Sequence, residues 1–248
     1  MKQFLHALPA VALFSLTPGA HASQFSDTQK AEMGTIIREY LLENPDVIFE
    51  AVEKSQDQQR IQEQQNFQEK FLENREALIK DAPFAGNPDG DVVVVEFFDY
   101  NCGYCHRALS DVMGLLESDP DVKVVFKDMP ILSPQSQDGA RWAIAAGKQG
   151  QYFAFHKKLM DLPGSKDMKA MERIAEELNL DLEQMRRDAE SDEVKAAIES
   201  NLSMARVFGI GGTPAFIIED TLVPGYMGLD ALKKSVADAR AAKQAPKN

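Results

Sequence analysis

The two cysteines of the chain, Cys102 and Cys105, lie in the stretch FFDYNCGYCH (residues 97–106). A C-x-x-C pair can cycle between a disulfide and two thiols, contribute ligands to a metal site, or carry a covalently attached haem. His106 follows directly and completes the haem attachment signature C-x-x-C-H. Because these three chemistries need different surroundings, the neighbouring elements must decide between them.

The cysteine pair is expected to lie where a buried strand gives way to a helix. Residues 92–98, VVVVEFF, form an apolar run broken only by Glu96, as expected of a buried strand. After Cys105 the apolar residues recur at helical spacing: Ala108, Leu109, Val112, Met113 and Leu116. Unpaired backbone N–H groups and the helix dipole favour a thiolate at Cys102. Cys105, one turn further on, is expected to point toward the core and to close a short disulfide with Cys102. In that arrangement Cys102 attacks a substrate disulfide and Cys105 resolves the mixed intermediate.

The rest of the chain predicts an α/β domain interrupted by helices. Residues 122–131 indicate a second strand, which completes a βαβ unit with the first strand and the helix. Residues 136–207 are nearly all helical in pattern. The segments TPAFIIED and TLVPGYMG then indicate two short strands, and LDALKKSVADARAA a final helix. A helical block is therefore inserted between a βαβ unit and a ββα unit, and the loop DAPFAGNPDGD precedes both.

These motifs resemble those of the DsbA family of exported thiol-disulfide oxidoreductases, which have a thioredoxin fold with an inserted helical domain. The resemblance covers about residues 83–241 and is most specific at EFFDYNCGYC and Thr213-Pro214. It implies a redox-active Cys102–Cys105 disulfide with no other cofactor. It also implies a cis Thr213–Pro214 bond beside the sulfurs, where the backbone pairs with substrate, and a buried Glu96 that moves a proton at Cys105. The residues expected nearest the substrate are Gly103, Tyr104, His106 and Gly212. A different reading of Glu96 is an acid at a strand bend that reaches water.

The N-terminal part divides into a signal peptide and a helical segment. Residues 1–22 have a Lys near the start, a short apolar region and a final Ala20-His21-Ala22, which predicts export and a periplasmic location. Residues 23–82 are helical in pattern, with apolar clusters at 36–52 and 67–79 that favour self-association. IIREYLLENPDVIFEAV resembles the N-terminal region of ScsC-like proteins, DsbA relatives linked to suppression of copper sensitivity. That resemblance implies an N-terminal oligomerisation segment and a homotrimer. Residues 242–248 are expected to form a flexible tail.

The resemblance implies a disulfide isomerase that works as an oligomer, with two alternatives. The chain could be a DsbA-like dithiol oxidase, although Gly103-Tyr104 differs from the Pro-His of the best known DsbA. It could also bind copper(I) at the reduced Cys102 and Cys105, since soft thiolates bind this ion well. The implied partners are exported proteins with disulfides or free thiols, together with a membrane redox partner. That partner is either a reductase like DsbD or ScsB or an oxidase like DsbB.

Other functions fit the sequence less well. A formal net charge of −12 argues against nucleic acid as a partner. A structural zinc site needs four ligands, of which Cys102, Cys105 and His106 offer three at most. A haem needs a second axial ligand and a pocket, and it does not require the apolar strand before the motif.

Overall fold

A computed structural model describes residues 25–245, so the predicted signal peptide (1–22) and the last residues of the predicted tail lie outside the described residues. The chain divides into two compact units, Met1–Gln59 and Arg60–Asn248, and each is considered by itself. No helix in the described part is long and apolar enough to span a bilayer.

The first unit holds α1 (Asp27–Glu43) and the beginning of α2 (Asp46–Ile79). Ser26 begins α1 with a capping box, in which its side chain and that of Gln29 satisfy each other's backbone N–H groups. None of the residues of α1 is buried. Many large apolar side chains of this unit are exposed, among them Met33, Ile36, Ile37, Tyr40, Leu42, Val47, Ile48, Phe49 and Val52.

The second unit is built on a sheet of five strands, in the order β1-β3-β2-β4-β5. The strands are β1 (Phe84–Gly86), β2 (Val92–Phe98), β3 (Val122–Asp128), β4 (Ala215–Ile218) and β5 (Thr221–Pro224). β2 and β3 are parallel, and the other neighbours are antiparallel. Every residue of β2 is buried, because this strand is central in the sheet and covered on both faces.

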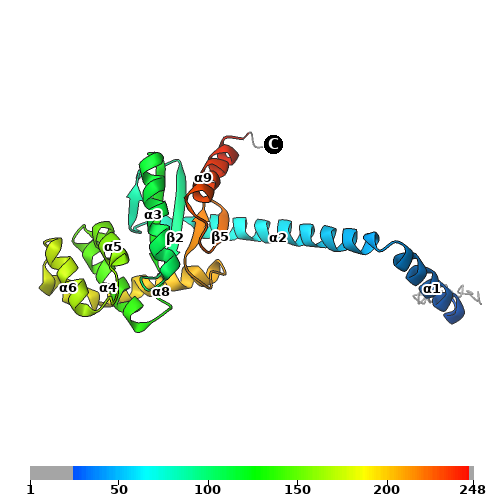
Figure 1. Cartoon of the computed structure of the whole chain (residues 1–248), viewed down its shortest axis with the longest axis horizontal. Coiled ribbons are helices and arrows are strands. Elements are labelled where there is room, and N and C mark those ends of the chain that lie inside the picture. The colour runs from blue at the N-terminus through cyan, green and yellow to red at the C-terminus, as the bar shows by residue number, and fades with distance from the viewer. Residues whose placement is uncertain (1–24, 246–248) are drawn as a thin grey trace, which may run out of the picture. The chain divides into compact units, whose positions relative to one another are not determined.

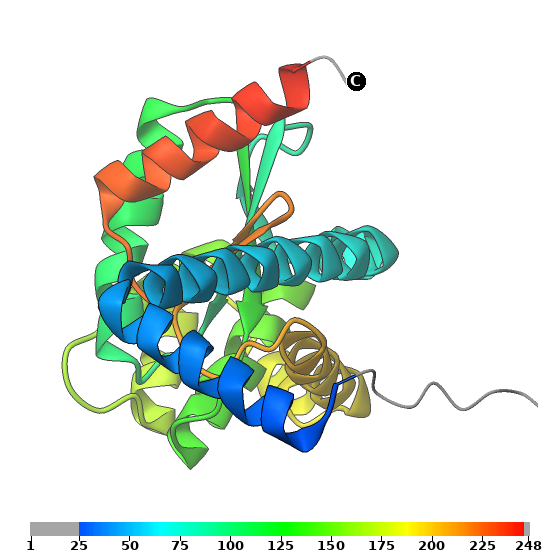
Figure 2. The same cartoon turned by 90° about the vertical axis from the view of Figure 1, so that its right-hand side faces the viewer.

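Helices cover both faces of the sheet. α3 (Gly103–Ser118) and α9 (Leu229–Gln244) lie side by side, as Figures 1 and 2 show, and they pack against the face that carries Val92 and Val94. The opposite face carries Val93 and Val95. It packs against the C-terminal part of α2 and the region around the end of α8 (Asp192–Val207).

The inserted block contains α4 (Pro134–Lys148), α5 (Tyr152–Asp161), α6 (Met168–Glu177), α7 (Leu182–Ala189) and α8. Four of these helices begin at a side-chain cap: Ser133, Asp167, Asp181 and Ser191. Such caps satisfy the first free N–H groups of a helix, which explains the sharp boundaries between these short elements. The block occupies almost the range predicted for it.

The predicted class, a thioredoxin fold with an inserted helical domain and N-terminal helices, is confirmed. Residues 81–91 were predicted to form a loop, whereas the structure has the short strand β1 there, paired antiparallel with β3. A strand of three residues is too short to show the alternation of apolar and polar side chains that identifies a strand in a sequence. α9 also continues to Gln244, inside the predicted tail.

Candidate active site

Cys102 stands at the N-terminus of α3, as its position after β2 predicts. It is the N-cap residue, and its Sγ accepts a hydrogen bond from the backbone N–H of Cys105 at 3.4 Å. The Cys102 thiol also donates to the backbone carbonyl of Thr213 at 3.2 Å. The side chain is 7% exposed, so the sulfur is reached only from one side.

Cys105 lies behind Cys102, with its side chain fully buried, and both cysteines are free thiols. Burial raises the pKa of the Cys105 thiol well above its usual range, and the neighbouring Glu96 and Cys102 contribute in the same direction. A buried thiol with a high pKa is inert until a base takes its proton. The attacking and resolving roles therefore fit Cys102 and Cys105 respectively.

Glu96 lies in the middle of β2, opposite Phe126 of β3 and Phe216 of β4. It is 2% exposed, so the reading in which it reaches water at a strand bend is wrong. Strand alternation places it on the face covered by α3, the helix that carries Cys105. Burial raises the pKa of Glu96 to about 8, and the carboxylate of Asp111 adds to this effect. A carboxyl group with such a pKa exchanges its proton near neutral pH.

The Thr213–Pro214 peptide bond is cis, as the family resemblance implies. This loop brings the Thr213 carbonyl to Cys102, although the two residues are 111 positions apart in the chain. A cavity of about 200 Å³ lies beside it, lined by the glycine-rich loop 209–212, Pro214, Leu222 and Pro224. The sulfurs, the carbonyl and this hollow therefore belong to one region.

Asp99 ties the turn before Cys102 to the segment that precedes α4. Its carboxylate accepts hydrogen bonds from the backbone N–H of Asn101 at 2.8 Å and from the Ser136 hydroxyl at 2.6 Å. It also accepts from the N–H groups of Ile131 and Leu132, at 2.9 and 3.0 Å. No motif in the sequence pointed to Asp99, although an acid directly after a buried strand and before a turn is a signal for such an anchoring residue.

Tyr100, which belongs to the same turn, forms a buried polar pair with His156 of α5. The Tyr100 hydroxyl lies 3.1 Å from Nδ1 of His156, and both side chains are 1% exposed. Burial lowers the pKa of His156 to about 3, so its ring is neutral at physiological pH. This histidine is thus part of the core.

The residues predicted to lie near the substrate have different surroundings. Tyr104 is 57% exposed, with the Arg107 guanidinium 5.2 Å from its ring centre and the Tyr226 ring 5.9 Å away. Gly103 and Gly212 have open space where a side chain would stand. His106 turns back toward the chain and donates from Nε2 to the Tyr100 carbonyl at 2.9 Å. Within residues 25–245, no three His, Cys, Asp or Glu side chains are grouped as metal ligands.

Comparison with known proteins gives two matches to family models. A DSBA-like thioredoxin domain matches residues 93–237, and the Copper resistance protein ScsC N-terminal domain matches residues 29–62. The first match covers more than half of the 248 residues.

Solved structures and curated proteins extend this result. A thioredoxin-like oxidoreductase from Silicibacter pomeroyi is 48% identical, with 69% of this chain and 99% of that one covered and a TM-score of 0.65. Proteus mirabilis ScsC in a transitional conformation is 27% identical, with 89% and 99% covered and a TM-score of 0.65. The Na(+)/H(+) antiporter NhaA 1 of Salinispora arenicola is 29% identical over 156 residues, which are 62% of this chain and 24% of the antiporter. The chain thus spans about a quarter of the length of such antiporter relatives. The chain belongs to the family of DSBA-like thioredoxin domains, and its N-terminal helices carry the ScsC N-terminal domain.

Proposed function

We propose that this protein is an exported thiol-disulfide oxidoreductase that exchanges protein disulfides through Cys102 and Cys105. The observation that carries this proposal is the position of the Cys102 sulfur. It lies at the start of α3, in hydrogen-bond contact with the Thr213 carbonyl and with Cys105 buried behind it. The Cys102–Cys105 disulfide is then the only redox group that the reaction needs.

The proposed reaction has two exchanges. The Cys102 thiolate attacks one sulfur of a substrate disulfide, so that a mixed disulfide forms and one substrate thiolate leaves. The Cys105 thiol then loses its proton and attacks Cys102, which forms the Cys102–Cys105 disulfide and releases the second substrate thiolate. The substrate gains two electrons and the protein loses two. In isomerisation, a second thiol of the substrate attacks the mixed disulfide instead, and Cys102 is released without net oxidation.

Glu96 is the group that we assign to the proton of Cys105. It faces α3 from the buried strand, and within the described residues its nearest charged influence is another acid, Asp111. The ionised forms of Glu96 and Cys105 are both costly in this interior. We assign Glu96 as the base because its pKa lies near neutral, so that its carboxylate is available to take the proton as Cys105 attacks the mixed disulfide. We assign substrate contact to Tyr104, which is exposed two residues after Cys102. His106, which bonds to the Tyr100 carbonyl, would act on the reaction through that turn.

We further propose that the protein acts as an isomerase in a homotrimer. The support is the unburied apolar surface of the first unit, where Ile36, Leu42 and Phe49 are 64%, 70% and 70% exposed. Exposed apolar clusters of this kind mark interaction surfaces, and the match to the ScsC N-terminal domain covers the same helices. Several active sites held in one assembly would meet the same misfolded substrate repeatedly.

The expected setting is the periplasm, with exported proteins as substrates. An isomerase must keep Cys102 reduced, so a DsbD- or ScsB-like membrane reductase is the matching partner. A DsbB-like oxidase would instead keep the protein as a dithiol oxidase.

Refolding of scrambled ribonuclease by the mature chain tests the isomerase proposal. A double variant, Ile36→Glu with Phe49→Glu, should dissociate the oligomer and abolish isomerisation, while reduction of a small disulfide continues. Glu32→Gln on α1 is the control and should change neither the oligomeric state nor the isomerase activity. Substitution is preferable to deletion of residues 23–80, because Phe71 and Leu78 are buried in the core of the second unit. A monomeric double variant with full isomerase activity would refute the proposal.

Copper(I) binding is a second candidate, favoured by two adjacent free thiols and by the match to the ScsC N-terminal domain, which is described as part of a copper resistance protein. Titration of the reduced protein with copper(I) should give a complex that is lost in Cys102→Ser. Equal binding by that variant would exclude this site.

A further inference from the structure

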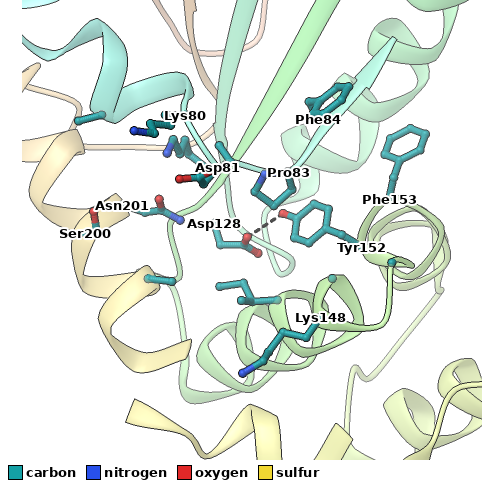
Figure 3. Close-up of a pocket in the computed structure, with 17 residues that line it drawn as sticks. Lys80, Asp81, Pro83, Phe84, Asp128, Lys148, Tyr152, Phe153, Ser200 and Asn201 are labelled. Atoms are coloured by element: carbon teal, nitrogen blue, oxygen red, sulfur yellow. Dashed lines mark hydrogen bonds between the residues drawn. The ribbon is translucent and has the colours of Figure 1, made fainter. Parts of the chain in front are cut away.

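A cavity of about 590 Å³ lies in the second unit, away from the cysteines, beside the last residues of β3. Figure 3 shows Asp128 among the lining residues, with Tyr152 bonded to it and Asn201 opposite Phe153. The lining comes from the end of α2, β1, β3, α4, α5 and α8. Its volume lies within the range of roughly 300–1,000 Å³ that is typical of small-molecule sites.

One wall of the cavity is apolar, and three lining residues define it: Phe84, Ile144 and Phe153. Phe84 is 41% exposed and Phe153 only partly buried, so two aromatic rings remain available to a ligand. Aromatic and aliphatic walls with a few polar groups are the usual composition of a site for a small organic molecule.

The polar wall holds an unpaired cation. Lys127 is 7% exposed, yet no hydrogen bond or ion pair joins its ammonium group to any residue of the described part of the chain. Another buried lysine, Lys166, donates to the Leu162 carbonyl at 3.2 Å. Burial lowers the pKa of Lys127, and the neighbouring charge of Asp128 acts in the opposite direction. The ammonium nitrogen is not among the fully buried side-chain atoms of the described residues that lack a partner, so it reaches the solvent of the cavity and is open to an anion there.

Asp128 and Asn201, which line the cavity near Lys127, can donate further hydrogen bonds to an anion bound there. Asp128 accepts from the Tyr152 hydroxyl at 2.7 Å through Oδ2, whereas its Oδ1 is buried and has no partner within residues 25–245. Burial raises the pKa of Asp128 to about 7, so a large share of this carboxyl is protonated near neutral pH and can donate. The Asn201 amide also lines the cavity.

The other charged lining residues are engaged or open to solvent. Lys80 pairs with Glu76 at 3.2 Å and Lys148 with Glu193 at 2.6 Å. Asp81 is exposed, so solvent screens its charge. The free cation of the cavity is therefore Lys127, as far as the described residues show.

We propose that this cavity binds a small organic carboxylate, whose anion pairs with Lys127 and whose apolar body lies against Phe84 and Phe153. The ligand supplies the acceptor that the ammonium group lacks, and its apolar body covers the two rings. Neither cysteine is among the residues that line this cavity.

Calorimetric titration of the full mature chain with 4-phenylbutyrate tests this site, with 4-phenyl-1-butanol as the uncharged match. Loss of a charge-assisted hydrogen bond should weaken phenylbutyrate binding by about tenfold or more in Lys127→Met. Lys158→Met is the matched control. Lys158 lies on α5 and pairs with Glu177 at 2.8 Å, and the residue is not part of the cavity lining. That variant should bind the carboxylate as the native chain does. The alcohol should bind weakly and equally to all three proteins.

A cavity-filling variant gives an independent measurement. Ala197→Phe places a ring among the lining residues and should abolish phenylbutyrate binding, while the Lys127 charge remains. Lys234→Gln, on the exposed face of α9, should leave the affinity unchanged. Absence of binding to the native chain would overturn the proposal. Binding that survives both Lys127→Met and Ala197→Phe, or that is lost only in Lys234→Gln, would also overturn it.

Discussion

The Cys102 thiol donates a hydrogen bond to the Thr213 carbonyl at 3.2 Å, although the two residues are 111 positions apart in the chain. This contact joins the helix that carries the cysteine pair to the loop before β4. We propose that a substrate peptide pairs with the backbone of residue 213 as an added strand would, because this would hold the peptide beside the Cys102 sulfur.

Glu96→Gln should slow the second exchange without slowing the first. The amide keeps the shape of the side chain but cannot take the proton from Cys105, and loss of a positioned acid or base costs about a hundredfold or more. Stopped-flow measurement of mixed-disulfide formation and decay separates the two steps. Glu117→Gln, exposed on α3, is the control. Equal rates of decay in Glu96→Gln and the native chain would remove Glu96 from the mechanism.

The same substitution should change how stability depends on pH. The pKa of Glu96 is about 8 in the folded chain, against an ordinary value of 4.5. Between these values the folded state keeps a proton that the unfolded state has lost, so the free energy of unfolding falls as pH rises. Glu96→Gln removes that slope, which amounts to at most about 1.4 kcal/mol per pH unit.

Urea unfolding at several pH values across this range measures the difference between the two proteins. The advantage of the Gln variant over the native chain should grow from mildly acidic to mildly alkaline solution. A difference that stays constant, or that shrinks as pH rises, would mean that Glu96 is ionised in the folded protein.

Asp99→Asn should both destabilise the protein and loosen the active-site turn. The carboxylate accepts from Asn101, Ser136, Ile131 and Leu132. An amide would turn its NH₂ group toward at least one of these donors, and an unsatisfied buried group costs about 1–3 kcal/mol. We expect a lower urea midpoint and slower reaction of Cys102 with a thiol reagent or substrate. Asp238→Asn on the exposed face of α9 should alter neither. Unchanged stability in Asp99→Asn would show that the four contacts do not act as an anchor.

Much of this fold follows from local patterns. The run from Val92 to Phe98 could only be a buried strand, and the spacing of Ala108, Val112 and Leu116 predicted the helix that follows. Strand β1 was missed, because three residues at a sheet edge owe their conformation to pairing with β3 and not to their own sequence.

The candidate site divides in the same way. Cys102 and Cys105 were found from their spacing, and Pro214 from a short motif. The anchoring role of Asp99 and the influence of Asp111 on Glu96 depend on contacts between elements that are distant or opposite in the fold, which no local pattern specifies. The cavity beside Lys127 was not predicted either, since six separate elements meet to form it.

Capture of a mixed disulfide tests the central claim most directly. Cys105→Ser should accumulate a covalent complex between Cys102 and a substrate protein, because the buried resolving thiol is absent. The complex should be visible on a non-reducing gel and located at Cys102 by mass spectrometry. Cys102→Ser should form no complex and lose all exchange activity. Exchange that continues in Cys102→Ser, or a complex that forms at Cys105 in the native chain, would contradict this account.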